Sequence, residues 1–214
     1  MAFSDFKSIF DVANDYQTVL EKDTIFVDTP LMLLPEWFMK DLNYSLKTKK
    51  PNPSEIAICE NLISPIIRYV AQQHQHINIW SREFDLQADA KLCGTPDYLF
   101  SYTETQHRVS KTMPLICVSE AKVDNFTTAW GQTLAEMVAC QKLYPDMVIY
   151  GFASNGEMWQ FAKLDNNIFT QDTNSYNITT QTEKIAGLLN YIFTEAVGEA
   201  EKHLRSVGKI GLVN

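Results

Sequence analysis

The chain has 214 residues, of which 45% are hydrophobic and 12% aromatic, and its formal charge is −8. A chain of this size and composition can bury a sizeable core within one domain. Because there is no apolar run of the roughly 18 residues that a membrane span needs, and no signal-peptide pattern, no membrane partner and a cytoplasmic location are expected. The negative charge excludes a broad basic footprint for nucleic acid, so any such contact has to be local.

Residues 1–52 are expected to form a helical N-terminal extension that packs on the main domain. Apolar residues at helical spacing mark 4–22, and a second apolar segment, "PLMLLPEWFMKDLNYSL", follows. The break "KTKKPNP" ends this region, and its basic residues, Lys47 to Lys50, are interpreted as a solvated loop. Residues 53–214 then form the main domain.

A strong helical pattern opens the main domain in "PSEIAICENLISPIIRYVAQQ". Ser54 is a suitable cap, and Pro65 is expected to bend the helix. One face is predicted from residues that recur at steps of three and four, namely Ile56, Glu60, Ile63, Ile67 and Val70. Glu60 is thereby expected among apolar neighbours, where an unpaired carboxylate would be costly.

Strands follow in the middle of the chain. Alternation predicts one strand within 77–89, a second within 94–104 and a third within 114–122, after which helical spacing returns over 126–144. Further strands flank Asn155-Gly156, a dipeptide that favours a tight hairpin because both residues tolerate positive φ. A closing helix occupies 182–207. A helix between strands indicates a crossover, so the pattern predicts a mixed α/β sheet with helices on both faces.

Charged residues stand where the second and third of these strands could meet. Since side chains alternate along a strand, Glu120 and Lys122 share one face. Pro96-Asp97 begins the preceding strand, and a hairpin between the two would bring Asp97 beside Glu120. Adjacent carboxylates repel unless a cation lies between them, and hard oxygen ligands favour Mg²⁺ or Mn²⁺. Lys122 would then position an attacking water or help to deprotonate it.

These segments carry a resemblance. "GTPDYLF" followed by "VSEAK" resembles the signature of the PD-(D/E)xK, or restriction-endonuclease-like, nuclease superfamily. "SNGEMWQF" and "ENLISPIIR" are similar to segments of the nuclease domain at the N-terminus of type I restriction enzyme motor subunits. The resemblance covers Ser54 to Asp165. It implies a restriction-endonuclease-like mixed sheet flanked by helices and the metal-dependent hydrolysis of phosphodiester bonds, with DNA as the expected partner.

The resemblance also implies roles for single residues. Asp97 and Glu120 would bind Mg²⁺ or Mn²⁺, helped by the backbone carbonyl of Ala121. Lys122 would orient the hydrolytic water and offset charge on the phosphate. The competing interpretation makes Glu120 and Lys122 a surface ion pair of little energetic value, and Asp97 a turn residue after Pro96.

Two further residues have implied roles. Glu60 would complete the metal shell directly or through water, although Glu55 in the first turn of the same helix is an alternative. Gln132 would contact phosphate or the water network, or be an ordinary surface amide. Many nucleases of this class are dimers, so a homodimer is compatible with the sequence. The alternative function is a member of the same fold that no longer cuts and serves as a nucleic-acid-binding or protein-interaction module.

Overall fold

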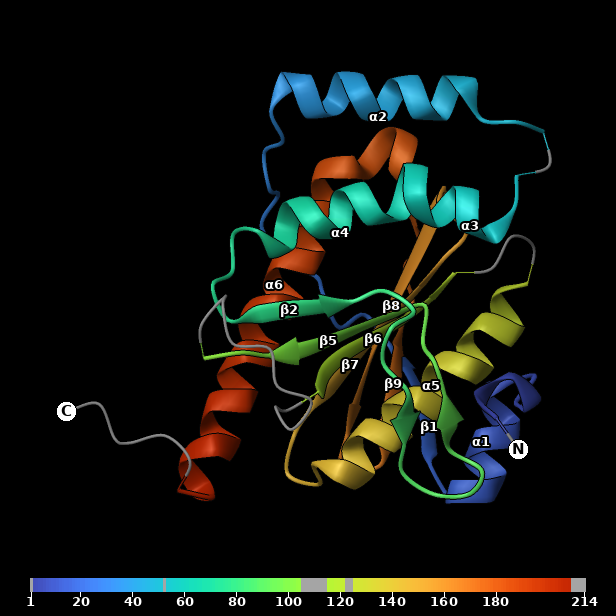
Figure 1. Ribbon diagram of the computed structural model, residues 1–214, viewed down its shortest axis with the longest axis vertical. Coiled ribbons are helices and arrows are strands. Elements are labelled where there is room, and N and C mark those ends of the chain that lie inside the picture. Colours follow the sequence, from blue (N-terminus) through green and yellow to red (C-terminus); the bar gives the residue numbers. More distant parts are fainter. Residues whose placement is uncertain (1, 52, 105–114, 122–124, 209–214) are drawn as a thin grey trace.

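The computed structural model describes residues 2–51, 53–104, 115–121 and 125–208. In this part of the chain, helices lie on both faces of one large mixed sheet (Figure 1). The α-helices are α1 (Ile9–Tyr16), α2 (Glu36–Thr48), α3 (Glu55–Ile58), α4 (Ser64–Ala71), α5 (Phe126–Leu143) and α6 (Ile178–Ser206). A 3₁₀ turn, η1 (Phe3–Asp5), precedes α1, and a π-helical turn, η2 (Cys59–Ile63), joins α3 to α4.

The strands are β1 (Val19–Asp23), β2 (Ile77–Trp80), β3 (Leu86–Gln87), β4 (Cys93–Gly94), β5 (Tyr98–Tyr102), β6 (Leu115–Ala121), β7 (Ile149–Ser154), β8 (Met158–Asp165), β9 (Ile168–Asp172) and β10 (Tyr176–Asn177). The main sheet has the order β1-β9-β8-β7-β6-β5-β2, with β10 paired to β8, and β3 and β4 form a separate pair. Helix α5 connects β6 to β7, which are parallel neighbours. The predicted crossover and the α/β class are therefore confirmed.

The N-terminal region contributes a strand as well as helices. The prediction for this region names helices alone, but β1 pairs in parallel with β9 and lies at the edge of the main sheet. Helix α1 packs on α5, and the closest approach is at Gly131, where a Cβ atom would lie 2.6 Å from the backbone N of Ser8. The sequence of β1, Val-Leu-Glu-Lys-Asp, has little alternation, so its strand conformation depends on pairing with β9 more than on local pattern.

The basic run at 47–50, predicted to be a solvated loop, has partners in the structure. Lys47 and Thr48 are the last residues of α2. The ammonium of Lys49 pairs with the carboxylate of Glu157, which lies between β7 and β8. The connector before α3 is thereby attached to one end of the main sheet.

The helix after this connector differs from its prediction in phase. Ser54 caps it as expected, because its Oγ accepts a hydrogen bond from the Ala57 N–H at 3.2 Å. The wider π-turn η2 then adds a residue just before Pro65, whose ring cannot fit a regular α-helical turn. As a result Ile56 is 57% exposed and Glu60 is exposed, so the prediction that both lie on the apolar face is wrong.

The hairpin predicted at Asn155-Gly156 joins β7 to β8, but its turn is of another type. Gly156 has a φ of +87°, whereas Asn155 contributes through its side chain, whose Oδ1 accepts a hydrogen bond from the Glu157 N–H at 3.1 Å. A Cβ atom at Gly156 would lie 2.8 Å from Cγ2 of Ile58. The turn therefore packs closely against the end of α3.

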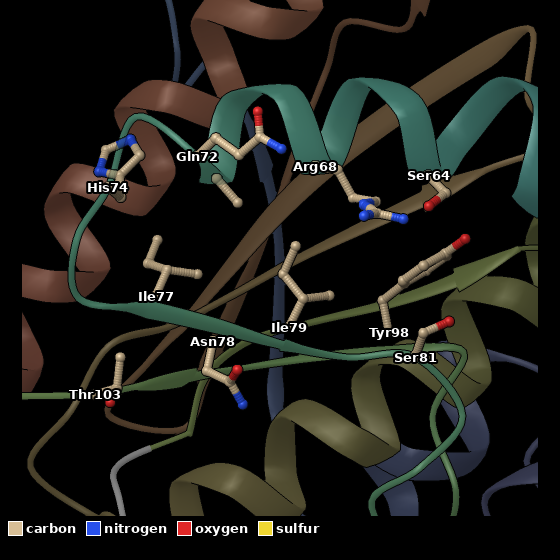
Figure 2. Close-up of a pocket in the computed structure, with 11 residues that line it drawn as sticks. Ser64, Arg68, Gln72, His74, Ile77, Asn78, Ile79, Ser81, Tyr98 and Thr103 are labelled. Atoms are coloured by element: carbon tan, nitrogen blue, oxygen red, sulfur yellow. The ribbon is translucent and has the colours of Figure 1, made fainter. Parts of the chain in front are cut away.

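The helices form two layers around the sheet. Helices α3, α4 and α6 pack on one face, with α2 outside α3 and α4, while α5 and α1 cover the other face (Figure 1). Between α4 and the edge strand β2 a cavity of about 570 Å³ remains (Figure 2). Among the helices of the described residues, none is long and apolar enough to span a bilayer.

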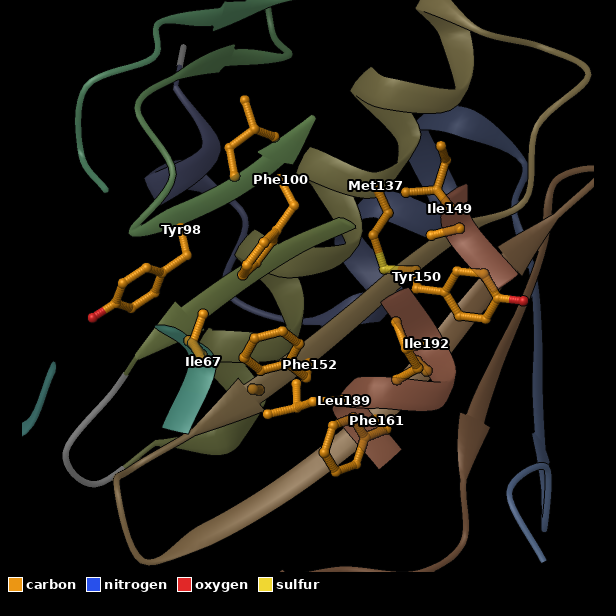
Figure 3. Close-up of a cluster of buried hydrophobic side chains, with 14 of the residues drawn as sticks. Ile67, Tyr98, Phe100, Met137, Ile149, Tyr150, Phe152, Phe161, Leu189 and Ile192 are labelled. Atoms are coloured by element: carbon orange, nitrogen blue, oxygen red, sulfur yellow. The ribbon is translucent and has the colours of Figure 1, made fainter. Parts of the chain in front are cut away.

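Aromatic side chains form the centre of the core beneath α6. Phe100 of β5, Phe152 of β7 and Phe161 of β8 follow one another, with ring centroids 6.0 Å and 5.9 Å apart. Leu189 and Ile192 of α6 lie beside them (Figure 3). All five side chains are fully buried, and burial of one such side chain stabilises the fold by about 1.5–3 kcal/mol. The central strands are thus held firmly enough to position charged residues at their ends.

Candidate functional site

The register of β5 and β6 leads Asp97 and Glu120 to the same end of the sheet. The two strands are antiparallel, and Tyr98 pairs with Ser119. Asp97 precedes Tyr98 and Glu120 follows Ser119, so a ladder longer by one residue would set Asp97 opposite Glu120. Residues opposite each other in an antiparallel pair have their side chains on one face, with Cβ atoms about 4.5–5.5 Å apart. The ladder itself ends at the Tyr98–Ser119 pair, and Asp97 is at a bend just before it, so the structure brings Asp97 and Glu120 to the same end of the sheet and their pairing stays a prediction.

Glu120 faces helix α5. It is 4% exposed and pairs in parallel register with Ala153 of β7. Gly151, two residues before Ala153, is on the same face, and a Cβ atom there would lie 2.6 Å from Sδ of Met137 in α5. The Glu120 carboxylate is thus covered by a helix and shielded from solvent, a setting in which charge interactions are strong.

Helix α5 presents a second carboxylate on the β6 side. On its β8 side, the Trp130 Nε1–H donates to Oε1 of Gln160 at 2.7 Å. Thr133 and Met137 lie against β7, so the helical repeat sets Gln132 and Glu136 on the opposite flank, the flank nearer β6.

Both residues are buried, with exposed fractions of 8% for Gln132 and 1% for Glu136. A surface amide is therefore excluded as the interpretation of Gln132. The sequence pattern did not single out Glu136, although it stands four residues after Gln132 in a helix with few other charges. The spacing of four residues from Gln132, in a helix that is otherwise mostly apolar, is the sequence signal that could have identified Glu136.

Asp97 is paired with a cation of the chain itself. Nε of Arg82 donates to Oδ1 of Asp97 at 2.7 Å, and the Arg82 backbone N–H donates to the Asp97 carbonyl at 3.2 Å. The guanidinium also donates to Sγ of Cys59 at 3.2 Å. Arg82 has a φ of +54°, which is uncommon for a residue with a side chain and is a form of local strain that collects at functional sites.

The groups around this ion pair have shifted pKa values. Burial opposes the charge of Arg82, but the hydrogen bond and the charge of Asp97 outweigh it and raise the guanidinium pKa. Burial and the negative charge of Asp97 raise the pKa of the Cys59 thiol to about 11. Burial also raises the pKa of Tyr98, whose hydroxyl donates to the carbonyl of Cys59 at 3.3 Å. Both Cys59 and Tyr98 are neutral at pH 7, so Arg82 and Asp97 are the charged groups of this cluster.

The remaining predicted residues have mixed outcomes. Ala121 ends β6, where its backbone pairs in register with Ser154, and Lys122 lies outside the described residues. Glu60 is exposed, and its carboxylate has no hydrogen bond or ion pair within the part of the chain that the structure describes. Its neighbour Cys59 touches Arg82, so Glu60 is at the same end of the sheet as Asp97. Glu55, the alternative, is half-buried in the first turn of α3.

Some of the side chains of the candidate site carry the oxygen atoms that a hard divalent cation prefers. Asp97, Glu120 and Glu136 supply carboxylate oxygens, the ligands that Mg²⁺ prefers. Across residues 2–51, 53–104, 115–121 and 125–208, however, no three His, Cys, Asp or Glu side chains gather closely enough to hold a metal ion. The backbone carbonyl of Ala121 would be a further oxygen ligand in addition to these side chains. A cation at Asp97 would also have to replace the guanidinium of Arg82.

Comparison with known proteins adds no relative. No protein-family model, no curated protein and no solved structure matches this chain.

Proposed function

We propose that the protein is a metal-dependent nuclease of the PD-(D/E)xK type, with a restriction-endonuclease-like arrangement of sheet and helices and with DNA as its substrate. One observation carries this proposal. The β5–β6 register ends with the pair Tyr98 and Ser119, so Asp97 and Glu120, the residues next to this pair, come to the same end of the sheet. Burial of Glu120 and the helix α5 above it support the proposal, because a shielded carboxylate acts more strongly on a cation than an exposed one.

The residues have distinct parts in the proposed reaction. Asp97 and Glu120 would hold Mg²⁺ or Mn²⁺, together with the backbone carbonyl of Ala121, and Glu60 would complete the metal shell directly or through water. When bound, the metal would neutralise charge on the phosphate and lower the pKa of the water that it binds. Lys122 would orient the attacking water and offset charge on the phosphate.

Helix α5 provides the outer part of this site. The Gln132 amide donates to the phosphate or to the water network. Glu136 lies on the same flank of α5 and orients these groups by accepting hydrogen bonds from them. Both side chains are buried, so their positions are fixed by packing of the helix on β6 and β7.

The test is cleavage of supercoiled plasmid and of single-stranded DNA with Mg²⁺, with Mn²⁺ and with EDTA. Glu120→Gln keeps the shape of the buried side chain and removes its charge, so we expect activity to fall at least about a hundredfold. Lys122→Ala should lose activity to a similar extent. Glu199→Gln is the matched control, because Glu199 pairs with Lys202 on α6, and it should cleave like the wild type. Equal cleavage by all four proteins would identify a contaminating nuclease and remove the proposal.

The Arg82–Asp97 ion pair favours a second function, a nuclease fold that binds nucleic acid or protein without cutting. In that case Arg82 serves in place of the metal, and the cluster is purely structural. Binding of Mn²⁺ in a titration separates the two. The nuclease requires saturable binding that Glu120→Gln abolishes, whereas the binding module shows none in either protein.

A further inference from the structure

A cavity of about 570 Å³ begins one residue away from the candidate site. Its walls are the side of α4 and the edge strand β2, and it ends at Ser81 and Tyr98, the neighbours of Arg82 and Asp97 (Figure 2). The volume falls within the range of about 300–1,000 Å³ that is typical of small-ligand sites. A group bound here would therefore lie on the α4 side of the sheet, next to Ser81 and the start of β5.

The cavity is lined for an anion. Arg68 of α4 extends toward Tyr98, with the hydroxyl of Ser64 next to it, and Gln72 follows one turn further along the helix (Figure 2). Among the described residues that line it, none is Asp or Glu. Arg68 is exposed, and within the described residues its guanidinium has no ion pair, whereas Arg82 and Arg205 each pair with a carboxylate. An unpaired guanidinium beside hydroxyl and amide donors is suited to a phosphate group.

The floor of the cavity is apolar. Ile77 and Ile79 of β2 point toward α4, one on each side of Asn78 (Figure 2). A free phosphate ion would gain nothing from these side chains. A nucleotide unit would, because its sugar and base carry apolar surface that the isoleucines can cover.

We infer that this cavity binds one nucleotide unit of a nucleic-acid strand, with Arg68 on its phosphodiester, and that the strand continues past the start of β5 toward Asp97 and Glu120. The inference rests on the proposed function, in which such a strand reaches those two residues. It also explains how a chain of charge −8 holds a polyanion. Contact would be confined to this cavity, whose described lining contains Arg68 without an ion pair and no carboxylate.

The test measures binding separately from cleavage. A short fluorescein-labelled single-stranded DNA is titrated with the full chain in EDTA, and fluorescence anisotropy is followed at several salt concentrations. Arg68→Gln should weaken binding roughly tenfold, because a charge-assisted hydrogen bond to phosphate is lost. The slope of log K against log [salt] should fall by about 0.7, the value for one phosphate contact on a single strand. Arg68→Lys should keep the slope and lose only part of the affinity.

Arg205→Gln is the matched control, since Arg205 pairs with Glu201 at the end of α6 and lies outside the cavity. It should change neither affinity nor slope. Melting temperatures of all variants should be equal, because Arg68 is exposed and makes no ion pair with the described residues.

Each other outcome counts against the inference. Equal binding and equal slope in Arg68→Gln overturn it, and so does a wild type that does not bind the oligonucleotide. Displacement of the oligonucleotide by inorganic phosphate or a mononucleotide at equal concentration would assign the cavity to a free small anion instead. Cleavage in Mg²⁺ is recorded on the same samples. Cleavage without an Arg68 effect retains the proposed function and removes the inference, whereas Arg68-dependent binding without cleavage does the reverse.

Discussion

Asp89 and Asp97 both pair with a basic side chain, but they are held by different kinds of partner. Asp89 lies in the short loop between β3 and β4, and its carboxylate accepts hydrogen bonds from the backbone N–H groups of Lys91 and Leu92, from the Tyr16 hydroxyl and from the Lys142 ammonium. Burial alone would raise its pKa, but these donors lower it well below the usual range for aspartate.

Asp97 is held by the side chain of a loop residue. Nε of Arg82 reaches it from a backbone with positive φ, and the Arg82 side chain is 35% exposed. Donors on the backbone are fixed by the fold, whereas a side chain can leave by rotating about its own bonds. The comparison indicates that Asp89 stabilises the structure, whereas the Arg82–Asp97 ion pair can be broken by rotation of the Arg82 side chain alone.

The largest expected effect is on stability, at Asp89. Asp89→Asn should lower the free energy of unfolding by about 2 kcal/mol, because charge-assisted hydrogen bonds are lost. For a chain of this size the melting temperature should fall by about 4–8 °C. Asp97→Asn breaks a half-exposed ion pair and should cost less than about 1 kcal/mol. Thermal unfolding at pH 7 compares them, and a greater loss in Asp97→Asn would reverse the assignment.

The same comparison has a pH dependence. The pKa of Asp89 is depressed in the folded chain, so its contribution is present at neutral pH and is lost as the pH falls below the ordinary value of 3.8. The difference in stability between wild type and Asp89→Asn should therefore shrink from about pH 5 to about pH 3. A difference that stays constant over this interval would show that the charge of Asp89 does not matter.

A smaller effect is expected on metal affinity. Arg82→Gln removes the cation that competes at Asp97, so Mn²⁺ should bind up to about fivefold more tightly, the equivalent of an ion pair worth about 1 kcal/mol. Isothermal titration calorimetry with Mn²⁺ measures this change in affinity. The double variant with Asp97→Asn is the control and should show no gain. Unchanged or weaker binding in Arg82→Gln alone would mean that the guanidinium does not oppose the metal.

The smallest effect concerns Cys59. Its thiol pKa is raised in the folded chain from 9.0 to about 11, so the unfolded chain loses this proton first as the pH rises. The wild type should lose somewhat less than about 1 kcal/mol of stability between about pH 8 and about pH 9.5 through this group. Cys59→Ala, which has no thiol, should lack that part of the decline. Urea unfolding at the two pH values tests it, and parallel curves would contradict it.

The main strands and α5 could be predicted because their sequences repeat with the period of the structure they form. The strand 115–121 and the helix 126–143 begin and end within a residue or so of the predicted positions. Asp97 and Glu120 were selected for the same reason, since a register follows from alternation in two neighbouring strands, and their action as a pair stays a prediction. The sequence pattern was therefore sufficient to predict those elements whose bounds depend on their own periodicity.

Other features depend on contacts that sequence does not display. Glu60 was misplaced because the π-turn before Pro65 shifts the helical phase by a residue. The turn at Asn166-Asn167, where both residues have positive φ, was missed although asparagine is the side-chain-bearing residue that most readily adopts that conformation. Arg82 lies 15 residues from Asp97 in a stretch without periodicity, so no sequence pattern predicts their ion pair.

Strand β1 has a consequence for folding. It pairs with β9, and the hydrogen bond from Thr18 to Asn167 beside this pairing closes a separation of 149 residues. Closing a loop of that length costs roughly 4 kcal/mol in chain entropy, so β1 is expected to dock late, after the β8–β9 pair is formed. Until then the outer edge of β9 has open backbone donors and acceptors that can pair with another chain. Refolding yield should therefore depend on protein concentration through this one edge.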